Sequence, residues 1–263
     1  MDYVYDLTKD IYVDTNGDGV IGLEDIYGFV SDTVTSLDCY MLTSGQPIFT
    51  KTDTGIEVGL GTERALSVYE KVYKLLFESE GSLVRGVGTE YTDKYTVFMD
   101  DRALVIPVRL VELYSTFRDM EGGYGILPYP KYDELQNEYY TSCLDAYSVL
   151  CIPNNVENIE LVGALSEAMA CESKYSVMPV FYETALQEKY SRDAKSAEML
   201  DIIMDGRTFD LCVLYSEAAG GAKKFLRNVI REDKPYASTY ESSKKMLEGN
   251  AANLYEKLKN IGN

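Results

Sequence analysis

The feature that most constrains the fold is the alternation of short apolar runs with longer amphipathic segments along the chain. The short runs are typical of buried strands, and the longer segments are typical of helices with one buried face. Strands that alternate with helices favour an α/β protein. A chain of 263 residues is long enough for one large domain or for two lobes with a sizeable core.

The clearest helix is expected over residues 62–79, with Thr62 as its N-cap and Gly81 as a stop signal. Its core face should be Ala65, Leu66, Tyr69, Val72, Tyr73, Leu76 and Phe77. A final helix should begin at a capping box formed by Ser238 and Glu241. The core face of that helix should be Leu247, Ala251, Leu254, Leu258 and Ile261.

The remaining elements are expected from shorter patterns. Apolar runs predict strands at 26–30 and within 122–134 and 142–155, and a hairpin turn at Asp100 and Asp101 before a buried strand. Helical spacing predicts helices at 159–173, 180–190, 194–204 and 216–230. The first of these helices should be capped by Asn155 or Asn158.

The stretch "DTNGDGVIGLED", residues 14–25, has the spacing of a twelve-residue calcium loop. Hard cations prefer several oxygen ligands, and alternate residues of such a loop supply them. The expected ligands are Asp14, Asn16, Asp18, the carbonyl of Val20, and Asp25. Gly19 falls at position six, where the sharp turn favours glycine.

Two departures weaken the calcium pattern. The twelfth position is Asp25 instead of the longer Glu, and Gly22 offers no side chain at position nine, with Glu24 as a reserve ligand. Asn, Asp and Gly also form good turns without any ion, so a plain turn stays open as the alternative. Because the loop is single and precedes an apolar strand, a bound ion is expected to be structural and not a sensor.

Composition excludes several function classes. Asp and Glu total 43 against 25 Lys and Arg, which gives a net charge of −18 and argues against nucleic-acid or anionic-lipid partners. No apolar stretch is long enough to span a membrane. The five cysteines are dispersed without a CxxC pair, so they are expected to be buried free thiols.

Histidine is absent, which removes the usual general base and the common Ser-His and Cys-His nucleophile pairs. Asp100 and Asp101 are adjacent and point apart, whereas glycoside hydrolysis needs two carboxyl groups that face each other across a substrate. We therefore expect no enzyme activity. The 23 tyrosines instead offer flat faces with polar tips, which suit a sugar ligand.

The order of several stretches resembles the extracellular solute-binding proteins of ABC importers, the group that includes the maltose-binding-protein-like family 1. These stretches are "DTNGDGVIGLEDIYGF", "LTSGQPIF", "TERALSVYEKVYKLL", "FMDDRALVIPV", "YGILPYPK" and "YSVLCIPNNVENIELVGALSEAM". The resemblance implies an α/β, two-lobe, type II periplasmic-binding-protein-like fold. It also implies import of a carbohydrate by an extracellular lipoprotein that delivers its ligand to ABC permease subunits.

The export signal, lipidated Cys and N-terminal region of that family have no counterpart here. The chain is therefore expected to be a C-terminal fragment with one nearly complete lobe and part of the other. The resemblance implies that residues 1–144, with the calcium loop at 14–25, are mainly lobe 2. Residues 145–180 would be part of lobe 1, and the helical residues 181–263 would return to lobe 2.

Ligand contacts are expected at strand ends and lobe crossings, because binding sites lie in clefts between lobes. The candidates are Asp38, Tyr40, Arg109, Asp145, Tyr147, Tyr215 and Glu217. Asp, Glu and Arg would hold sugar hydroxyls, and Tyr would stack on a sugar ring. A calcium-dependent dockerin-like or adhesion module is the alternative function, although a second calcium loop is missing from the sequence.

Overall fold

Strand β2, Ile26–Asp32, lies at the centre of the main sheet and is buried from Tyr27 onward. The computed structural model describes residues 1–86, 88–144, 146, 148–181 and 194–259. Strands β5 (Ser82–Arg85) and β6 (Ala103–Val105) pair with β2 in parallel, and β1 (Tyr12–Val13) pairs with it antiparallel. Because β2, β5 and β6 run in the same direction, their carboxyl ends meet at one edge of the sheet.

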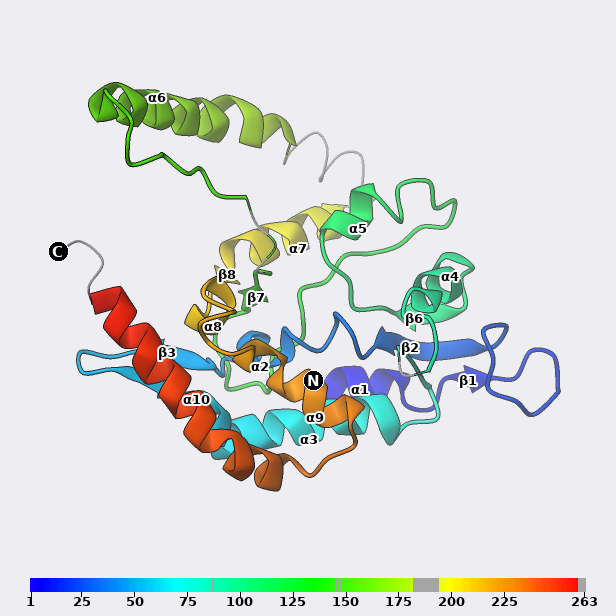
Figure 1. Ribbon diagram of the computed structural model, residues 1–263. Coiled ribbons are helices and arrows are strands. Elements are labelled where there is room, and N and C mark those ends of the chain that lie inside the picture. Colours follow the sequence, from blue (N-terminus) through cyan, green and yellow to red (C-terminus); the bar gives the residue numbers. More distant parts are fainter. Residues whose placement is uncertain (87, 145, 147, 182–193, 260–263) are drawn as a thin grey trace.

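Helices cover both faces of this sheet (Figure 1). One face packs against α1 (Asp2–Thr8) and α3 (Glu63–Phe77), and the other packs against α4 (Asp93–Met99). Phe29 belongs to the large cluster on the α3 side, whereas the next residue, Val30, packs with Val97 of α4. Adjacent strand residues pointing to opposite faces are expected in a sheet buried on both sides.

Helix α3 forms where the sequence predicts it. The Thr62 hydroxyl accepts a hydrogen bond from the Ala65 amide (3.1 Å), which confirms the N-cap. The most deeply buried residues of the helix are Ala65, Val68, Val72, Leu75 and Leu76. Phe77, predicted on this face, is exposed because it lies at the last turn of the helix.

The C-terminal elements complete the large apolar cluster to which α3 belongs. They are α8 (Leu211–Leu214), a 3₁₀ turn (Ala222–Lys224), α9 (Phe225–Arg231) and α10 (Tyr236–Lys259). Helix α10 packs on the hairpin of β3 (Phe49–Lys51) and β4 (Ile56–Val58), on the 3₁₀ turn Gly59–Gly61 and on α3. Its buried residues include Leu247, Ala251 and Leu254, as predicted, and Leu258 packs beside them, whereas Ile261 lies outside the described residues.

The remaining short elements form a second, smaller group around α7. They are α5 (Val111–Tyr114), α7 (Ala194–Asp205), and the parallel pair β7 (Thr141–Ser142) and β8 (Arg207–Thr208). Helix α2 (Tyr40–Thr43) lies beside β7 but packs on α3 in the large cluster. A separate apolar cluster joins Leu113 of α5 and Phe117 to Leu200 of α7. This cluster gives the residues after β6 a core of their own.

Helix α6 (Ile159–Glu172) extends away from the rest of the described chain (Figure 1). Its Asn158 cap is confirmed, since the side chain accepts a hydrogen bond from the Leu161 amide (2.9 Å). Its apolar residues are nevertheless not covered, and Leu165 and Met169 are each 59% exposed. A π-helical turn, Ser173–Val177, follows directly. No helix in the described ranges combines the length and apolar character that crossing a membrane requires.

Several sequence expectations for local structure are wrong. Asp100 and Asp101 follow helix α4 and lead into β6, so they are not the turn of a hairpin. Residues 122–134 form no strand. Among the described residues of 142–155, only Ser142 belongs to a strand, the short β7. Ser238 lies inside the first turn of α10, where its hydroxyl donates to the carbonyl of Pro235 (3.2 Å), so it is not the N-cap.

Candidate functional site

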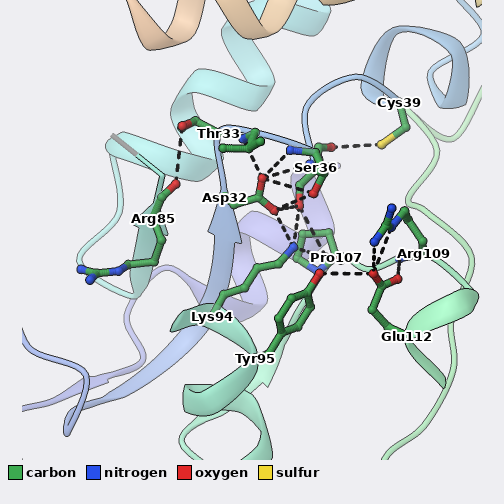
Figure 2. A network of polar contacts seen from close by, with 12 residues as sticks. Asp32, Thr33, Ser36, Cys39, Arg85, Lys94, Tyr95, Pro107, Arg109 and Glu112 are labelled. Atoms are coloured by element: carbon green, nitrogen blue, oxygen red, sulfur yellow. Dashed lines mark hydrogen bonds and ion pairs between the residues drawn. The ribbon is translucent and has the colours of Figure 1, made fainter. Parts of the chain in front are cut away.

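The carboxyl ends of β2, β5 and β6 are held together by a buried network around Asp32 (Figure 2). Asp32 is the last residue of β2, and its Oδ1 accepts hydrogen bonds from the amides of Val34 (2.6 Å) and Thr35 (2.5 Å). Its Oδ2 accepts one from the Ser36 hydroxyl (2.6 Å). Short polar residues directly after a buried strand favour such a turn, because their side chains bond nearby backbone groups.

Lys94 of α4 connects this turn to the segment after β6. Its Nζ donates to Asp32 Oδ2 (2.5 Å), to Ser36 Oγ (2.9 Å) and to the carbonyl oxygen of Pro107 (3.0 Å). The ammonium group therefore uses all three of its donors. Both side chains are fully enclosed, at 1% exposure for Lys94 and 0% for Asp32.

The charge of Asp32 is stabilised inside the protein. Burial by itself would raise the pKa of Asp32, but the neighbouring charge of Lys94 and the hydrogen bonds from Lys94, Ser36 and Thr35 lower it to about 2. The Asp32 carboxyl is therefore ionised at neutral pH, and it favours the charged form of Lys94 against the effect of burial. The pair fixes the separation between the loop after β2 and the segment after β6.

Three arginine–carboxylate pairs lie around this network. Arg85, the last residue of β5, donates to Asp93 through Nε (3.1 Å) and Nη2 (2.5 Å). Arg227 of α9 pairs with Asp38 (Nε to Oδ1, 3.2 Å) and donates to the carbonyl of Val34.

The third pair joins Arg109 to Glu112. Glu112 Oε1 accepts from Arg109 Nε (2.9 Å), and its Oε2 accepts from the Arg109 backbone amide (2.9 Å). The Tyr95 hydroxyl also donates to Glu112 (3.4 Å), as Figure 2 shows. The arrangement can hold polar groups of a ligand, because the exposed guanidinium of Arg109 keeps N–H donors in a fixed geometry.

The predicted ligand residues are only partly brought together. Asp38 and Arg109 both lie beside the Asp32 network. Tyr40 is buried in the large core cluster and packs edge-on against Tyr129, with ring centroids 5.5 Å apart. Asp145 and Tyr147 lie outside the described residues.

Tyr215 and Glu217 lie elsewhere, after α8. They line a shallow, open hollow together with Val213, Leu214, Ser216, Ala218 and Lys257. Tyr215 is 38% exposed. The candidates are therefore distributed over the strand edge, the core and this hollow, while Asp145 and Tyr147 lie outside the described residues.

The calcium-type loop is tightly wound by its own hydrogen bonds. Asp14 accepts from the amides of Gly17 (2.7 Å) and Gly19 (2.9 Å), and both glycines have positive φ, at 74° and 71°. Asp18 accepts from the Val20 amide (2.7 Å), and the Asn16 side-chain amide donates to Asp18 (3.0 Å). The side chains at positions one, three and five thus turn toward the loop interior.

Asp25 at position twelve is already well satisfied. It accepts from the amides of Gly22 (3.0 Å) and Thr15 (3.1 Å) and from the hydroxyl of Tyr12 (3.2 Å). The hydrogen bond from Gly22 is the largest cause of its lowered pKa. An ion that bound Asp25 would have to displace some of these donors. The described residues contain no group of three or more His, Cys, Asp or Glu side chains that could hold a metal ion.

Sequence reasoning missed Asp32, Lys94, Glu112 and Arg85. The pattern "SDTVTS" after the β2 run carried a usable signal, because Asp, Thr and Ser directly after a strand favour a side-chain-bonded turn. Nothing in the sequence marks Lys94, since a lysine in an amphipathic helix ordinarily faces solvent.

Comparison with known proteins identifies the fold. No protein-family model matches the chain, and no curated protein does either. Among solved structures, the chain is similar to the maltose-maltodextrin binding protein of the thermoacidophilic bacterium Alicyclobacillus acidocaldarius, with a TM-score of 0.50 and 12% sequence identity. The chain has a periplasmic-binding-protein-like α/β fold.

This likeness covers 84% of the present chain and 62% of the solved protein, so the chain spans less than two thirds of that protein's length. At 12% identity it establishes the fold and does not transfer a ligand or individual contact residues. The expected fold class is confirmed. The division into residues 1–144, 145–180 and 181–263 stays a prediction.

Proposed function

We propose that this chain is part of the substrate-binding component of an ABC importer and that the whole protein binds an oligosaccharide without hydrolysing it. The observation that carries the proposal is the fold shared with a maltose-maltodextrin binding protein. Strand carboxyl ends are the usual ligand edge of open α/β sheets. In this chain that edge holds Arg109, Arg85 and Arg227 in fixed pairs with carboxylates.

Binding without chemistry agrees with the residues at this edge. The chain contains no histidine, and the described carboxylates Asp32, Asp93 and Glu112 are each engaged with a cation. Delivery of the ligand to permease subunits and a cell-surface, lipid-anchored location complete the proposal.

Calcium is proposed as a structural ion of the 14–25 loop. Asp14, Asn16, Asp18 and the carbonyl of Val20 would hold it, with Asp25 as the twelfth-position ligand. The support is the inward turn of the first three side chains and the positive φ of Gly19. A bound ion would offset the mutual repulsion of three carboxylates in a short segment and so stabilise the start of β2.

The proposal is tested by a thermal-shift screen of the full-length protein against neutral oligosaccharides, acidic oligosaccharides and peptides. A ligand that binds the folded state raises the melting temperature by mass action. A shift with at least one oligosaccharide is expected. Shifts with peptides alone would place the protein in a different importer class, and no shift with any solute would contradict the proposal.

Site residues are tested next with single variants and titration calorimetry. Arg109→Ala should weaken the affinity at least tenfold, because a charged hydrogen-bond donor at the strand edge is lost. Tyr215→Ala tests the stacking role separately. Unchanged affinity in both variants would leave the importer class standing and overturn the choice of contact residues.

A further inference from the structure

We propose that Glu112 sets the substrate class of the strand-edge site, making it select uncharged sugars over anionic ones such as uronates. The inference rests on the proposed function, since it concerns which sugars the same site accepts. The inference follows from the pairing of Arg109, the most exposed arginine at this edge, with the carboxylate of Glu112.

Arg109 is the most accessible cation among the three pairs. Its side chain is 47% exposed, whereas Arg85 is 20% and Arg227 is 13% exposed. Its partner carboxylate is almost completely enclosed, at 3% exposure. A ligand at this edge therefore meets the guanidinium of Arg109 and not the carboxylate of Glu112.

Glu112 holds Arg109 from behind. The carboxylate accepts from the Nε and backbone amide of Arg109, each at 2.9 Å, and from Nη2 at 2.5 Å. The hydroxyl of Tyr95 contacts the same carboxylate from α4. These contacts fix the plane of the guanidinium and cancel its charge, while the group stays open to solvent on its other side.

The charge balance of the whole edge follows the same pattern. Arg85 is matched by Asp93, Arg227 by Asp38 and Lys94 by Asp32. An arginine whose charge is matched by a carboxylate still has N–H donors for sugar hydroxyls, and these hydrogen bonds do not require an anion. An anionic sugar would need an uncompensated cation, and the net charge of −18 on the chain opposes its approach.

Glu112→Gln is the sharpest test, because it removes one charge and keeps the shape and most hydrogen bonds of the side chain. Calorimetry on the full-length protein would compare maltotriose, a neutral probe, with trigalacturonate, an anionic one, at low salt. Wild type should prefer the neutral trisaccharide. Glu112→Gln should raise the affinity for the anionic trisaccharide, relative to the neutral one, at least tenfold.

Arg109→Gln provides a second variant with the opposite expectation. It leaves the Glu112 charge without its cation, so the preference against trigalacturonate should become stronger. Asp100→Asn is the matched control, since Asp100 pairs with Arg102 (2.6 Å) before the amino end of β6, away from the strand edge. Its ratio of affinities should equal that of wild type.

The outcomes separate this inference from the proposed function. Binding of either trisaccharide by wild type, with the same affinity ratio in Glu112→Gln, would overturn the role of Glu112 and leave sugar binding intact. A wild-type preference for trigalacturonate would also overturn it. If no sugar in the wider screen binds, the proposed function itself fails and this inference fails with it.

Discussion

Replacing Lys94 by Met should be among the most damaging single changes to the sheet edge. The substitution keeps the apolar stem of the side chain and removes an ammonium group that makes three hydrogen bonds of 2.5–3.0 Å. Removing one partner of a buried ion pair typically costs about 3–5 kcal/mol, because the other charge is left uncompensated. With Asp32 at 0% exposure, we expect a loss of about 4 kcal/mol in the free energy of unfolding at pH 7.

The pH dependence gives a second, independent signature. In wild type the pKa of Asp32 is lowered from 3.8 to about 2, so the stabilisation from its ionised form is present above pH 4 and is lost as the pH falls toward 2. Without Lys94, burial should raise that pKa above its unfolded value. The variant is then destabilised mainly at high pH, where Asp32 is ionised. The difference in the free energy of unfolding between variant and wild type should therefore become smaller as the pH falls from 7 to 4.

Urea unfolding followed by far-ultraviolet circular dichroism measures both effects, since the chain has no tryptophan for fluorescence. Lys234→Met is the control, because Lys234 and its partner Glu232 are both more than half exposed and such pairs contribute about 0–1 kcal/mol. The double variant Asp32→Asn/Lys94→Met should regain part of the loss. A cost below about 1 kcal/mol for Lys94→Met, or a gap that does not change with pH, would refute the reasoning.

Three further changes test other parts of the molecule. Millimolar calcium should raise the melting temperature and EDTA should reverse the rise, while Asp14→Ala should abolish it; a melting curve insensitive to calcium would show that the loop is only a turn. A protein of these 263 residues should self-associate through the uncovered α6, and Leu165→Glu/Met169→Glu should make it monomeric in light scattering, whereas a monomeric wild type would contradict this. Asp210→Ala should destabilise the fold by about 2–3 kcal/mol, because Asp210 accepts from the amides of Ile48, Phe49 and Cys212; an unchanged urea midpoint would be inconsistent with that role.

Elements with strong local signals could be predicted from sequence. Helix α3 combines a Thr62 cap with a regular apolar stripe, and β2 is a short apolar run beside a turn. The core face of α10 follows helical spacing over several turns. In each case local sequence and tertiary packing favour the same structure, so the pattern is sufficient.

The failures occur where tertiary contacts decide. The residues before Asp100 include Tyr95, Val97 and Phe98, which have high β-propensity, yet they form α4 because the helix packs on β2, β5 and β6. The α10 helix starts at Tyr236, directly after Pro235, so the Ser238 signal is overridden. The fold class was recognisable because the order of the elements persists where individual motifs are weak.

The site was harder to predict than the fold. Arg109 and Asp38 were predicted as ligand contacts because Arg109 follows an apolar run and Asp38 lies in the loop after β2, and their contact with a ligand stays a prediction. Lys94 and Glu112 come from helices that reach this edge only after the sheet has formed, and their burial depends on partners distant in sequence. Periodicity cannot distinguish a buried, paired lysine from an exposed one.

The central claim is that the whole protein binds an oligosaccharide and leaves it intact. Titration calorimetry of the full-length protein with maltohexaose and with other neutral oligosaccharides, followed by chromatography of the recovered sugar, tests this most directly. We predict saturable binding with a dissociation constant of about 1 μM or tighter to at least one of them, together with unchanged sugar length. Shortened sugar products, or no binding heat with any oligosaccharide from a protein that is demonstrably folded, would contradict the account.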